Sequence, residues 1–284
     1  NVLRLIPGGA EPGQTIVKHP DTGMIAFTGS TAVGRAIAQQ CAGTFKKTSL
    51  ELGGNNAFIV MADADIESAS SCAAWGSFLH QGQICMQSGR HIVHESIADK
   101  YVEALAARAN QLVTGNPFTE QCHLGPLINA QQAEKVRTLI EESVAMGAEI
   151  VTGGTIDTQL VSPTVLKNVS SDMPVFQQEI FGPVAPVVTF KTEQEAIALA
   201  NDTALGLSAS IHTSDSARGE YLATFINAGM VHINDQTVNN EYHIPFGGLK
   251  DSGDSGRIGG PVNLDEFTHT KWISVMNQGV QYPF

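Results

Sequence analysis

The sequence has few basic residues and no long hydrophobic run. Lysine and arginine number 16 against 28 aspartates and glutamates, so the formal net charge is −12. Because a phosphate backbone carries charge of the same sign, nucleic-acid binding is not expected. No apolar stretch approaches the roughly 20 residues of a membrane-spanning helix, and no signal peptide is recognisable. We therefore expect no nucleic-acid partner and no membrane partner.

Cysteine is also scarce, and the four cysteines do not form a disulfide framework. No two of them make a C-x-x-C pair, and Cys41 and Cys72 fall in alanine-rich stretches typical of core helices. We interpret them as reduced thiols and predict a cytoplasmic protein. No metal site is expected, because His91 and His94 fall on opposite faces of a predicted strand with no third ligand nearby.

What remains is an ordinary globular composition. Hydrophobic residues make up 42% of the 284 residues and charged residues 15%, enough for one large or two ordinary domains with a full core. The chain begins with Asn1 rather than methionine and reads at once as folded protein. We therefore expect it to be part of a longer protein.

Short apolar runs alternate with helical patterns along the chain. Strands are predicted at residues 24–28, 57–61, 91–94, 149–152, 207–212 and 230–234. Helices are predicted at residues 32–42, 66–80, 97–113, 129–147 and 192–201, the last opening with a capping box. This alternation predicts an α/β fold with a parallel sheet. The final stretch, 268–284, is expected to be extended.

The stretch GQICMQSGR places Cys85 in a loop directly after a predicted helix. Gly82 and Gly89 would let the backbone approach a ligand, and a loop is an accessible place for a nucleophilic thiolate. Free cysteines are also common as small buried hydrophobic residues. The residues alone leave both alternatives open.

Glu51 lies between two leucines in LELGG. Burial would raise the pKa of this carboxyl group and make it a general base, whereas a glutamate at a strand end can equally face water. In QEIFGP, Glu179 precedes Phe181 by two residues, a pairing that could hold ribose hydroxyls and a flat ring. The alternative there is a loop anchored by its phenylalanine and proline.

FTGSTAVG, residues 27–34, places glycine and serine at a strand-to-helix junction. The free amides and positive end of a helix favour a phosphate at such a junction. The pattern is not G-x-G-x-x-G, and a plain tight turn is the alternative.

In order along the chain, FTGSTAVG, LELGG, GQICM, QEIFGPV and PFGGLKDSG resemble the aldehyde dehydrogenase superfamily. The interval from Glu51 to Cys85 is similar to the family's spacing between general base and nucleophile. The resemblance implies that the Cys85 thiolate attacks an aldehyde and that its own backbone N–H holds part of the oxyanion. A hydride would then pass to NAD or NADP, and Glu51 would activate the water that releases the acid.

The same resemblance implies a set of cofactor contacts. Ser30 would bind the pyrophosphate, Val33 would pack near the adenine, and Glu179 and Phe181 would hold the nicotinamide ribose and ring. The full set expected to bind the cofactor is Gly29, Ser30, Val33, Gly34, Leu52, Gln132, Lys135, Glu179 and Phe181.

HQGQICM and the ending DEFT…KWI…YPF are similar to the benzaldehyde, vanillin and salicylaldehyde branch of the family. That likeness implies an aromatic aldehyde substrate, with His80 and Met86 near its pocket, although aliphatic aldehydes stay open. We expect residues 1–53 to be the back part of a Rossmann-like cofactor domain and 54–253 a catalytic domain. Residues 254–284 would carry an oligomerisation strand that pairs in a homodimer or homotetramer.

Family members extend further at the N-terminus, which leaves alternatives to an active dehydrogenase. One is a fragment that folds or assembles without catalysis. Another is an esterase in which Cys85 and Glu51 act without a cofactor. A coenzyme-A-acylating enzyme is disfavoured, because members of that kind lack a base at the position of Glu51.

Overall fold

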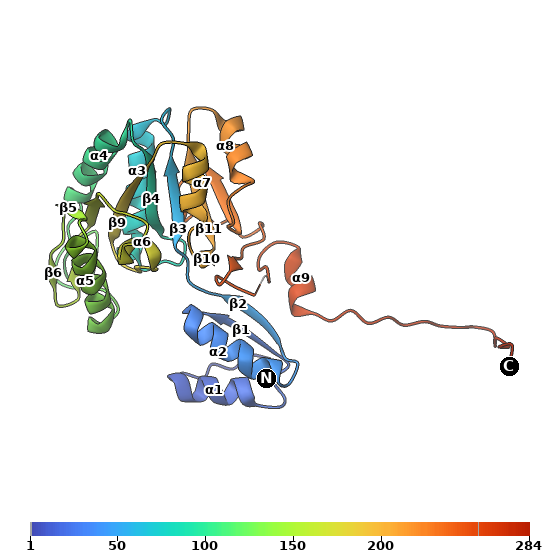
Figure 1. Cartoon of the computed structure of the whole chain (residues 1–284). Helices are drawn as coiled ribbons and strands as arrows, with labels where there is room; N and C mark the ends of the chain where they lie inside the picture. The colour runs from blue at the N-terminus through green and yellow to red at the C-terminus, as the bar shows by residue number, and fades with distance from the viewer. Residues whose placement is uncertain (1, 255) are drawn as a thin grey trace.

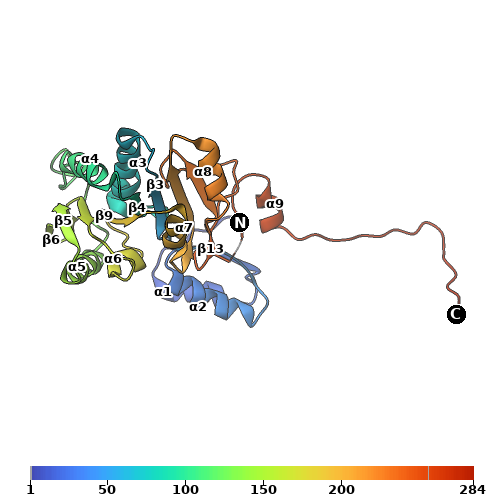
Figure 2. The ribbon, with the colours of Figure 1, turned by 45° about the horizontal axis from the view of Figure 1, so that its top comes forward.

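The computed structural model describes residues 2–254 and 256–284 (Figure 1). A larger unit is built on a seven-stranded sheet, and a smaller unit from the N-terminal end of the chain lies beside it. The chain after α9 (Val262–Phe267) runs away from both units, as the turned view also shows (Figure 2).

The smaller unit consists of α1 (Ala10–Lys18), β1 (Met24–Thr28), α2 (Thr31–Ala42) and β2 (Lys47–Glu51). β1 and β2 pair in parallel, and their apolar side chains pack with those of the helices in one cluster that contains Val17, Ile25, Ile37, Cys41, Leu50 and Leu52. The sequence did not predict α1. Pro12 and Gly13 argue against a helix in this stretch, because both residues disfavour helix interiors. Proline is nevertheless tolerated in a first helical turn, where its missing N–H is not needed.

The sheet of the larger unit has the strand order β12-β11-β3-β4-β9-β8-β5. Its strands, in chain order, are β3 (Asn56–Val60), β4 (Ser88–His94), β5 (Glu149–Thr152), β8 (Thr164–Lys167), β9 (Val184–Phe190), β11 (Ser208–His212) and β12 (Met230–Ile233). Shorter strands pair separately, β6 (Ile156–Asp157) with β7 (Leu160–Val161) and β10 (Leu205–Gly206) with β13 (Leu249–Lys250).

The α/β fold is confirmed, with one correction to the expectation of a parallel sheet. All neighbouring strands in the large sheet run parallel except β5, which pairs antiparallel with β8. No helix lies between β5 and β8 in the described chain. A parallel pair needs a long crossover connection, usually a helix, so a helix-free return favours the antiparallel arrangement.

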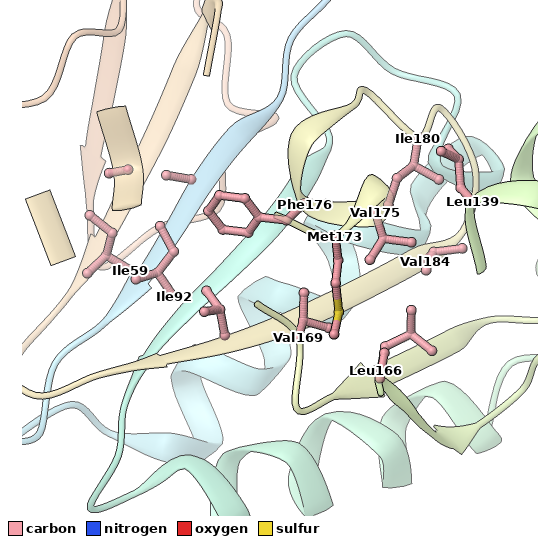
Figure 3. Packing of buried hydrophobic residues seen from close by; sticks show 14 of the residues in the cluster. Ile59, Ile92, Leu139, Leu166, Val169, Met173, Val175, Phe176, Ile180 and Val184 are labelled. Atoms are coloured by element: carbon pink, nitrogen blue, oxygen red, sulfur yellow. The ribbon is translucent and has the colours of Figure 1, made fainter. Parts of the chain in front are cut away.

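Helices cover both faces of this sheet, which is why β3 is buried along its whole length. Phe58 and Val60 face α3 (Ile66–Phe78) and α4 (Ala98–Asn110). The alternate residue Ile59 packs on the opposite face, against α5 (Ala130–Ala145), α6 (Pro174–Gln177), α7 (Glu193–Asn201) and α8 (Ser216–Ala223). Figure 3 shows part of this second cluster, with Ile59 and Ile92 from the sheet and Phe176 from α6.

Side-chain caps set the starts of several predicted helices. Asp65 accepts hydrogen bonds from the backbone N–H groups of Glu67 and Ser68 at the start of α3. Thr192 and Glu195 form the predicted capping box of α7. β8, β9 and α8 were not predicted from the sequence. β9 is a central strand that contains Pro186 in its interior, and proline is rare at such a position.

The C-terminal segment contains α9 (Val262–Phe267), and residues 268–284 follow as exposed chain without regular structure, as expected. The oligomerisation strand in this segment stays a prediction. Within the described residues, no helix combines the length and apolar character needed to cross a lipid bilayer.

Candidate active site

The end of β2 is fixed by a short segment from near the other end of the chain. Leu52 N donates to Ser252 O at 2.9 Å, and Leu50 N donates to the side-chain Oδ1 of Asp254 at 3.1 Å. Glu51 itself forms an antiparallel bridge with Gly253. Residues 252–254 therefore lie along β2, joined to it by an isolated bridge and two hydrogen bonds, and cover Glu51.

This cover buries the Glu51 carboxyl group. The residue is only 6% exposed, and its Oε2 has no hydrogen-bond partner among the described residues. Burial raises the pKa of Glu51 to about 7; Arg257 opposes this shift and Asp254 adds to it. The alternative of a glutamate facing water is excluded for this conformation. A carboxyl group that titrates near neutral pH is suited to general-base chemistry.

The two glycines after Glu51 lie in tight contact with neighbouring loops. A Cβ atom on Gly54 would lie 2.2 Å from the carbonyl oxygen of Cys85, and one on Gly53 would lie 2.5 Å from Oε2 of Glu179. Gly54 N also donates to Oε1 of Glu179 at 2.9 Å. The chain leaving Glu51 thus passes between Cys85 and Glu179, where only glycine fits.

Cys85 follows a strained turn. After α3 the chain enters a short 3-10 helix, η1 (Leu79–Gly82), in which three successive residues have positive φ: His80 at 50°, Gln81 at 58° and Gly82 at 68°. Left-handed backbone costs a non-glycine residue about 1–2 kcal/mol. Such strain clusters at functional sites, where the surrounding structure holds it in place.

Side-chain hydrogen bonds to backbone carbonyls hold the loop that contains Cys85. The Asn56 amide nitrogen donates to the carbonyl oxygens of Cys85 (2.9 Å) and Gln87 (2.7 Å), and its Oδ1 accepts from Ser208 N (2.9 Å). Thr237 Oγ1 donates to Met86 O at 2.6 Å. These bonds use the carbonyls of the loop and leave the half-buried Cys85 thiol free.

The Cys85 thiol lies near two acidic side chains. Burial raises its pKa to about 11, Glu179 and Glu51 contribute in the same direction, and the backbone N–H groups of Met86 and Cys85 oppose the shift. The thiol is therefore protonated at neutral pH in this conformation. A base must take its proton before the sulfur can act as a nucleophile.

The loop that carries Glu179 and Phe181 is held by α5. Lys135 Nζ donates to the backbone oxygen of Glu179 at 2.7 Å, and the Gln132 amide donates to the backbone oxygens of Ile180 (3.0 Å) and Phe181 (2.9 Å). These bonds support the positive φ of Phe181, 54°. Burial raises the pKa of the Glu179 carboxyl group. The hydrogen bond from Gly54 N–H and the charge of Lys135 act in the opposite direction and lower this pKa.

The start of α2 lies at the edge of the smaller unit. Ser30 caps this helix by accepting from Val33 N at 3.4 Å, and Gly29 N donates to Glu51 O at 3.0 Å. Ser30 is exposed, and Val33 is 48% exposed. A Cβ on Gly34 would lie 2.4 Å from Leu52, so close packing of α2 on β2 requires this glycine.

The backbone of Gly53 and Gly54, which follow the buried Glu51, contacts both Cys85 and the carboxyl group of Glu179. A model of the aldehyde dehydrogenase family matches residues 1–273. The chain belongs to this family.

Similar proteins are known among aldehyde dehydrogenases that act on aromatic compounds. The chain is 52% identical to a benzaldehyde dehydrogenase [NAD(+)] of Pseudomonas putida and 49% identical to a vanillin dehydrogenase of an Amycolatopsis species. Each match covers 100% of this chain and 58% of the relative. The chain thus spans less than two thirds of the length of the relatives it matches.

Solved structures give the same family. A salicylaldehyde dehydrogenase from Pseudomonas putida G7, complexed with salicylaldehyde, superposes with a TM-score of 0.93 at 40% identity. The match covers 96% of this chain and 57% of that one.

The expected site residues fall into separate groups. Gly54, three residues after Glu51, contacts both the carbonyl oxygen of Cys85 and the carboxylate of Glu179. The exposed start of α2 with Ser30 and Val33 lies in the smaller unit, and Leu52 lies in that unit's core rather than at its surface.

The two residues expected near the substrate differ in exposure. Met86 is buried, whereas His80 is exposed and lines a hollow of about 500 Å³ together with Trp75 and His123.

The residues that hold the Cys85 loop were not predicted from the sequence. Asn56 and Gln87 hold the loop, and Thr237 donates to the carbonyl oxygen of Met86. One signal was available: Asn55 and Asn56 directly precede the strand predicted at residues 57–61, and asparagine is depleted in and around strands unless its side chain has a role.

Proposed function

We propose that the protein oxidises an aldehyde to the carboxylic acid with NAD or NADP, and that its substrates are aromatic aldehydes. The observation that carries this proposal is the buried Glu51 carboxyl group, with its pKa near 7, brought to the Cys85 loop through the backbone contact at Gly54. The names of the benzaldehyde, vanillin and salicylaldehyde dehydrogenases to which the chain is similar support the aromatic substrate.

In this proposal the Cys85 thiol gives its proton to solvent water, its sulfur bonds to the aldehyde carbon, and the carbonyl electron pair moves to the oxygen, giving the thiohemiacetal anion. Backbone N–H groups of the cysteine loop face the sulfur and favour negative charge there. A nicotinamide held by Glu179 and Phe181 would supply the hydride acceptor, and loss of the hydride from the former aldehyde carbon would leave a thioester on Cys85. Glu51 then takes a proton from water, the water oxygen attacks the thioester carbon, and the acid leaves as the Cys85 sulfur is released.

Two groups of residues in this chain fit a nicotinamide cofactor, one at the start of α2 and one in the loop of Glu179 and Phe181. The exposed start of α2 offers backbone N–H groups and the Ser30 hydroxyl to a pyrophosphate, with Val33 exposed beside them for an apolar ring. On the other side of Gly54, the Glu179 carboxylate is an acceptor for ribose hydroxyls and Phe181 offers an aromatic face. Lys135 and Gln132 hold this second group through its backbone.

The remaining expectations belong to the same proposal. Residues 1–53 would complete a cofactor domain, 54–253 form the catalytic domain, and 254–284 pair with a second subunit in a homodimer or homotetramer. Trp272 and Ile273 in the C-terminal segment are exposed apolar residues, which suits an interface with a second subunit. A cytoplasmic location suits the four free thiols.

Cofactor-independent ester hydrolysis is a second candidate. It needs only a nucleophile and a base, and this chain holds both Cys85 and Glu51. Ester turnover that is unaffected by NAD or NADP, in a protein that does not oxidise aldehydes, would favour it.

The test is nicotinamide reduction by the complete protein, and by the 284-residue chain alone, with benzaldehyde and either NAD or NADP. We expect turnover in the complete protein that Cys85→Ala abolishes and Glu51→Gln slows at the acid-release step. Cys122→Ala removes a thiol that donates to Gly115 O and has no role in the proposal, so it serves as the matched control, with activity retained. A folded complete protein that reduces neither cofactor would overturn the proposal.

A further inference from the structure

Gln87 lies two residues after Cys85 and is almost fully buried, with 4% of its surface exposed. Its side-chain nitrogen donates to two backbone carbonyls, Gly182 O at 2.5 Å and Ser77 O at 3.2 Å. Ser77 belongs to the last turn of α3, whereas Gly182 follows Phe181 in the loop described above. One carboxamide thus joins the helix before the nucleophile to the loop on the far side of the site.

The contact at Gly182 is built from several directions. A Cβ on Gly82 would lie 2.3 Å from Gly182 O and 2.7 Å from the Gln87 nitrogen, so Gly82 leaves the space in which this bond forms. Gly182 O also accepts from Val184 N at 2.8 Å, which uses the second lone pair of the carbonyl. On its other side Gly182 packs against Val136 of α5, where a Cβ would lie 2.5 Å from Cγ2.

The backbone of Gln87 is fixed as tightly as its side chain. Gln87 N donates to Ile84 O at 3.0 Å, closing the turn that contains Cys85, and Gln87 O accepts from Asn56 at 2.7 Å. If the 179–182 loop moves while the hydrogen bond to Gln87 is kept, the turn that contains Cys85 must therefore move with it.

We propose that Gln87 is a positioning residue that sets the separation between the Cys85 turn and the loop of Glu179 and Phe181. The inference rests on the proposed function, in which Cys85 holds the substrate carbon and that loop holds the nicotinamide ribose and ring. Transfer between two groups requires that their carriers keep a fixed separation, and a misplacement of about 1 Å costs about 100-fold in rate. Ester hydrolysis uses Cys85 and Glu51 without the loop, so it depends far less on this bond.

The variant Gln87→Met keeps the length of the side chain and removes both N–H donors. In the complete protein we expect kcat for aldehyde oxidation to fall at least about 10-fold while kcat for 4-nitrophenyl acetate hydrolysis stays within about 3-fold. We also expect a larger primary isotope effect with benzaldehyde deuterated at the aldehyde carbon, because hydride transfer becomes rate-limiting.

Gln177→Met is the matched control. Gln177 also donates from its carboxamide to a backbone carbonyl, that of Ser171, but on exposed surface away from the cysteine loop. We expect both activities to stay within about 2-fold of the unsubstituted protein, as for surface substitutions generally.

A second readout needs no cofactor and no turnover. Amide hydrogen exchange in peptides covering residues 178–184 should accelerate at least about 3-fold in Gln87→Met and stay unchanged in Gln177→Met. If the unsubstituted protein fails to reduce either cofactor, the proposed function falls and the exchange result alone decides whether Gln87 holds the loop. Equal losses of both activities, or unchanged exchange and an unchanged activity ratio, would overturn the role of Gln87.

Discussion

The backbone of Gly54 touches the carbonyl oxygen of Cys85 so closely that a Cβ atom there would lie 2.2 Å away. The segment that follows Glu51 and the Cys85 loop are therefore in direct main-chain contact. Main chain responds to a clash by moving as a unit, unlike the flexible end of a side chain. The positions of Glu51 and Cys85 are therefore coupled through Gly54.

Replacing Gly54 with alanine should separate the two groups. We expect Gly54→Ala to lower kcat/KM for aldehyde oxidation by about 100-fold or more, because the Cys85 turn must shift to admit the methyl group. The same overpacking should destabilise the protein by about 1–3 kcal/mol. Steady-state kinetics and urea unfolding measure the two effects.

Gly43→Ala is the control for that substitution. Gly43 ends α2 with φ −65°, and its nearest neighbour to an added Cβ is Gln40 O at 4.0 Å. It should leave activity unchanged and stability equal or slightly higher, by up to about 1 kcal/mol. Wild-type kinetics in Gly54→Ala would show that the site tolerates the shift, contrary to this prediction.

Glu51 should make stability depend on pH near neutrality. Its pKa rises from 4.5 to about 7 in the folded protein, so its contribution is fully present below pH 4.5 and is lost as the pH rises through 7. Glu51→Gln has no such loss. We expect the variant to gain about 3 kcal/mol in unfolding free energy relative to the unsubstituted protein between pH 4.5 and pH 8.

Urea unfolding across that range is the measurement, with Glu141→Gln as control because Glu141 is exposed on α5. The control should track the unsubstituted protein at every pH. A constant difference between Glu51→Gln and the unsubstituted protein from pH 4.5 to pH 8 would mean that the carboxyl group is hydrated in solution.

Glu179 should lower the reactivity of the Cys85 thiol. Its negative charge is the second cause, after burial, of the raised pKa of Cys85. Glu179→Gln removes the charge and keeps an oxygen that can accept from Gly54 N. In the absence of cofactor we expect the pKa of the Cys85 thiol to fall and its alkylation by iodoacetamide at pH 8.5 to accelerate several-fold.

The measurement is a pH–rate profile of alkylation, read at the Cys85 peptide by mass spectrometry. Glu220→Gln, on an exposed position of α8, is the control and should not move the profile. Superimposable profiles for Glu179→Gln and the unsubstituted protein would show that its charge does not reach the thiol.

Local patterns were sufficient for much of the fold. The apolar run of β3 and the caps at Asp65 and Thr192 depend on neighbouring residues, and the structure confirms them. The antiparallel β5 and the proline-containing β9 depend instead on which strands lie beside them. No window of sequence around Pro186 contains that information.

The site shows the same division. Cys85 and Glu51 were each ambiguous by themselves; the order of the motifs favoured catalytic roles for both, and those roles stay predictions. The burial of Glu51 comes from Ser252 and Asp254, far away in the chain. Gln87 looked like one more polar residue after the cysteine, because the carbonyls that give it a role lie on other elements.

The segment 252–254 beside β2 has a consequence for the growing polypeptide. Leu50 and Asp254, whose hydrogen bond helps to cover Glu51, lie 204 residues apart in sequence. At a synthesis rate of about 5–20 residues per second, the later residue emerges about 10–40 seconds after the earlier one. The bridge and hydrogen bonds that cover Glu51 can therefore form only after these later residues have been made.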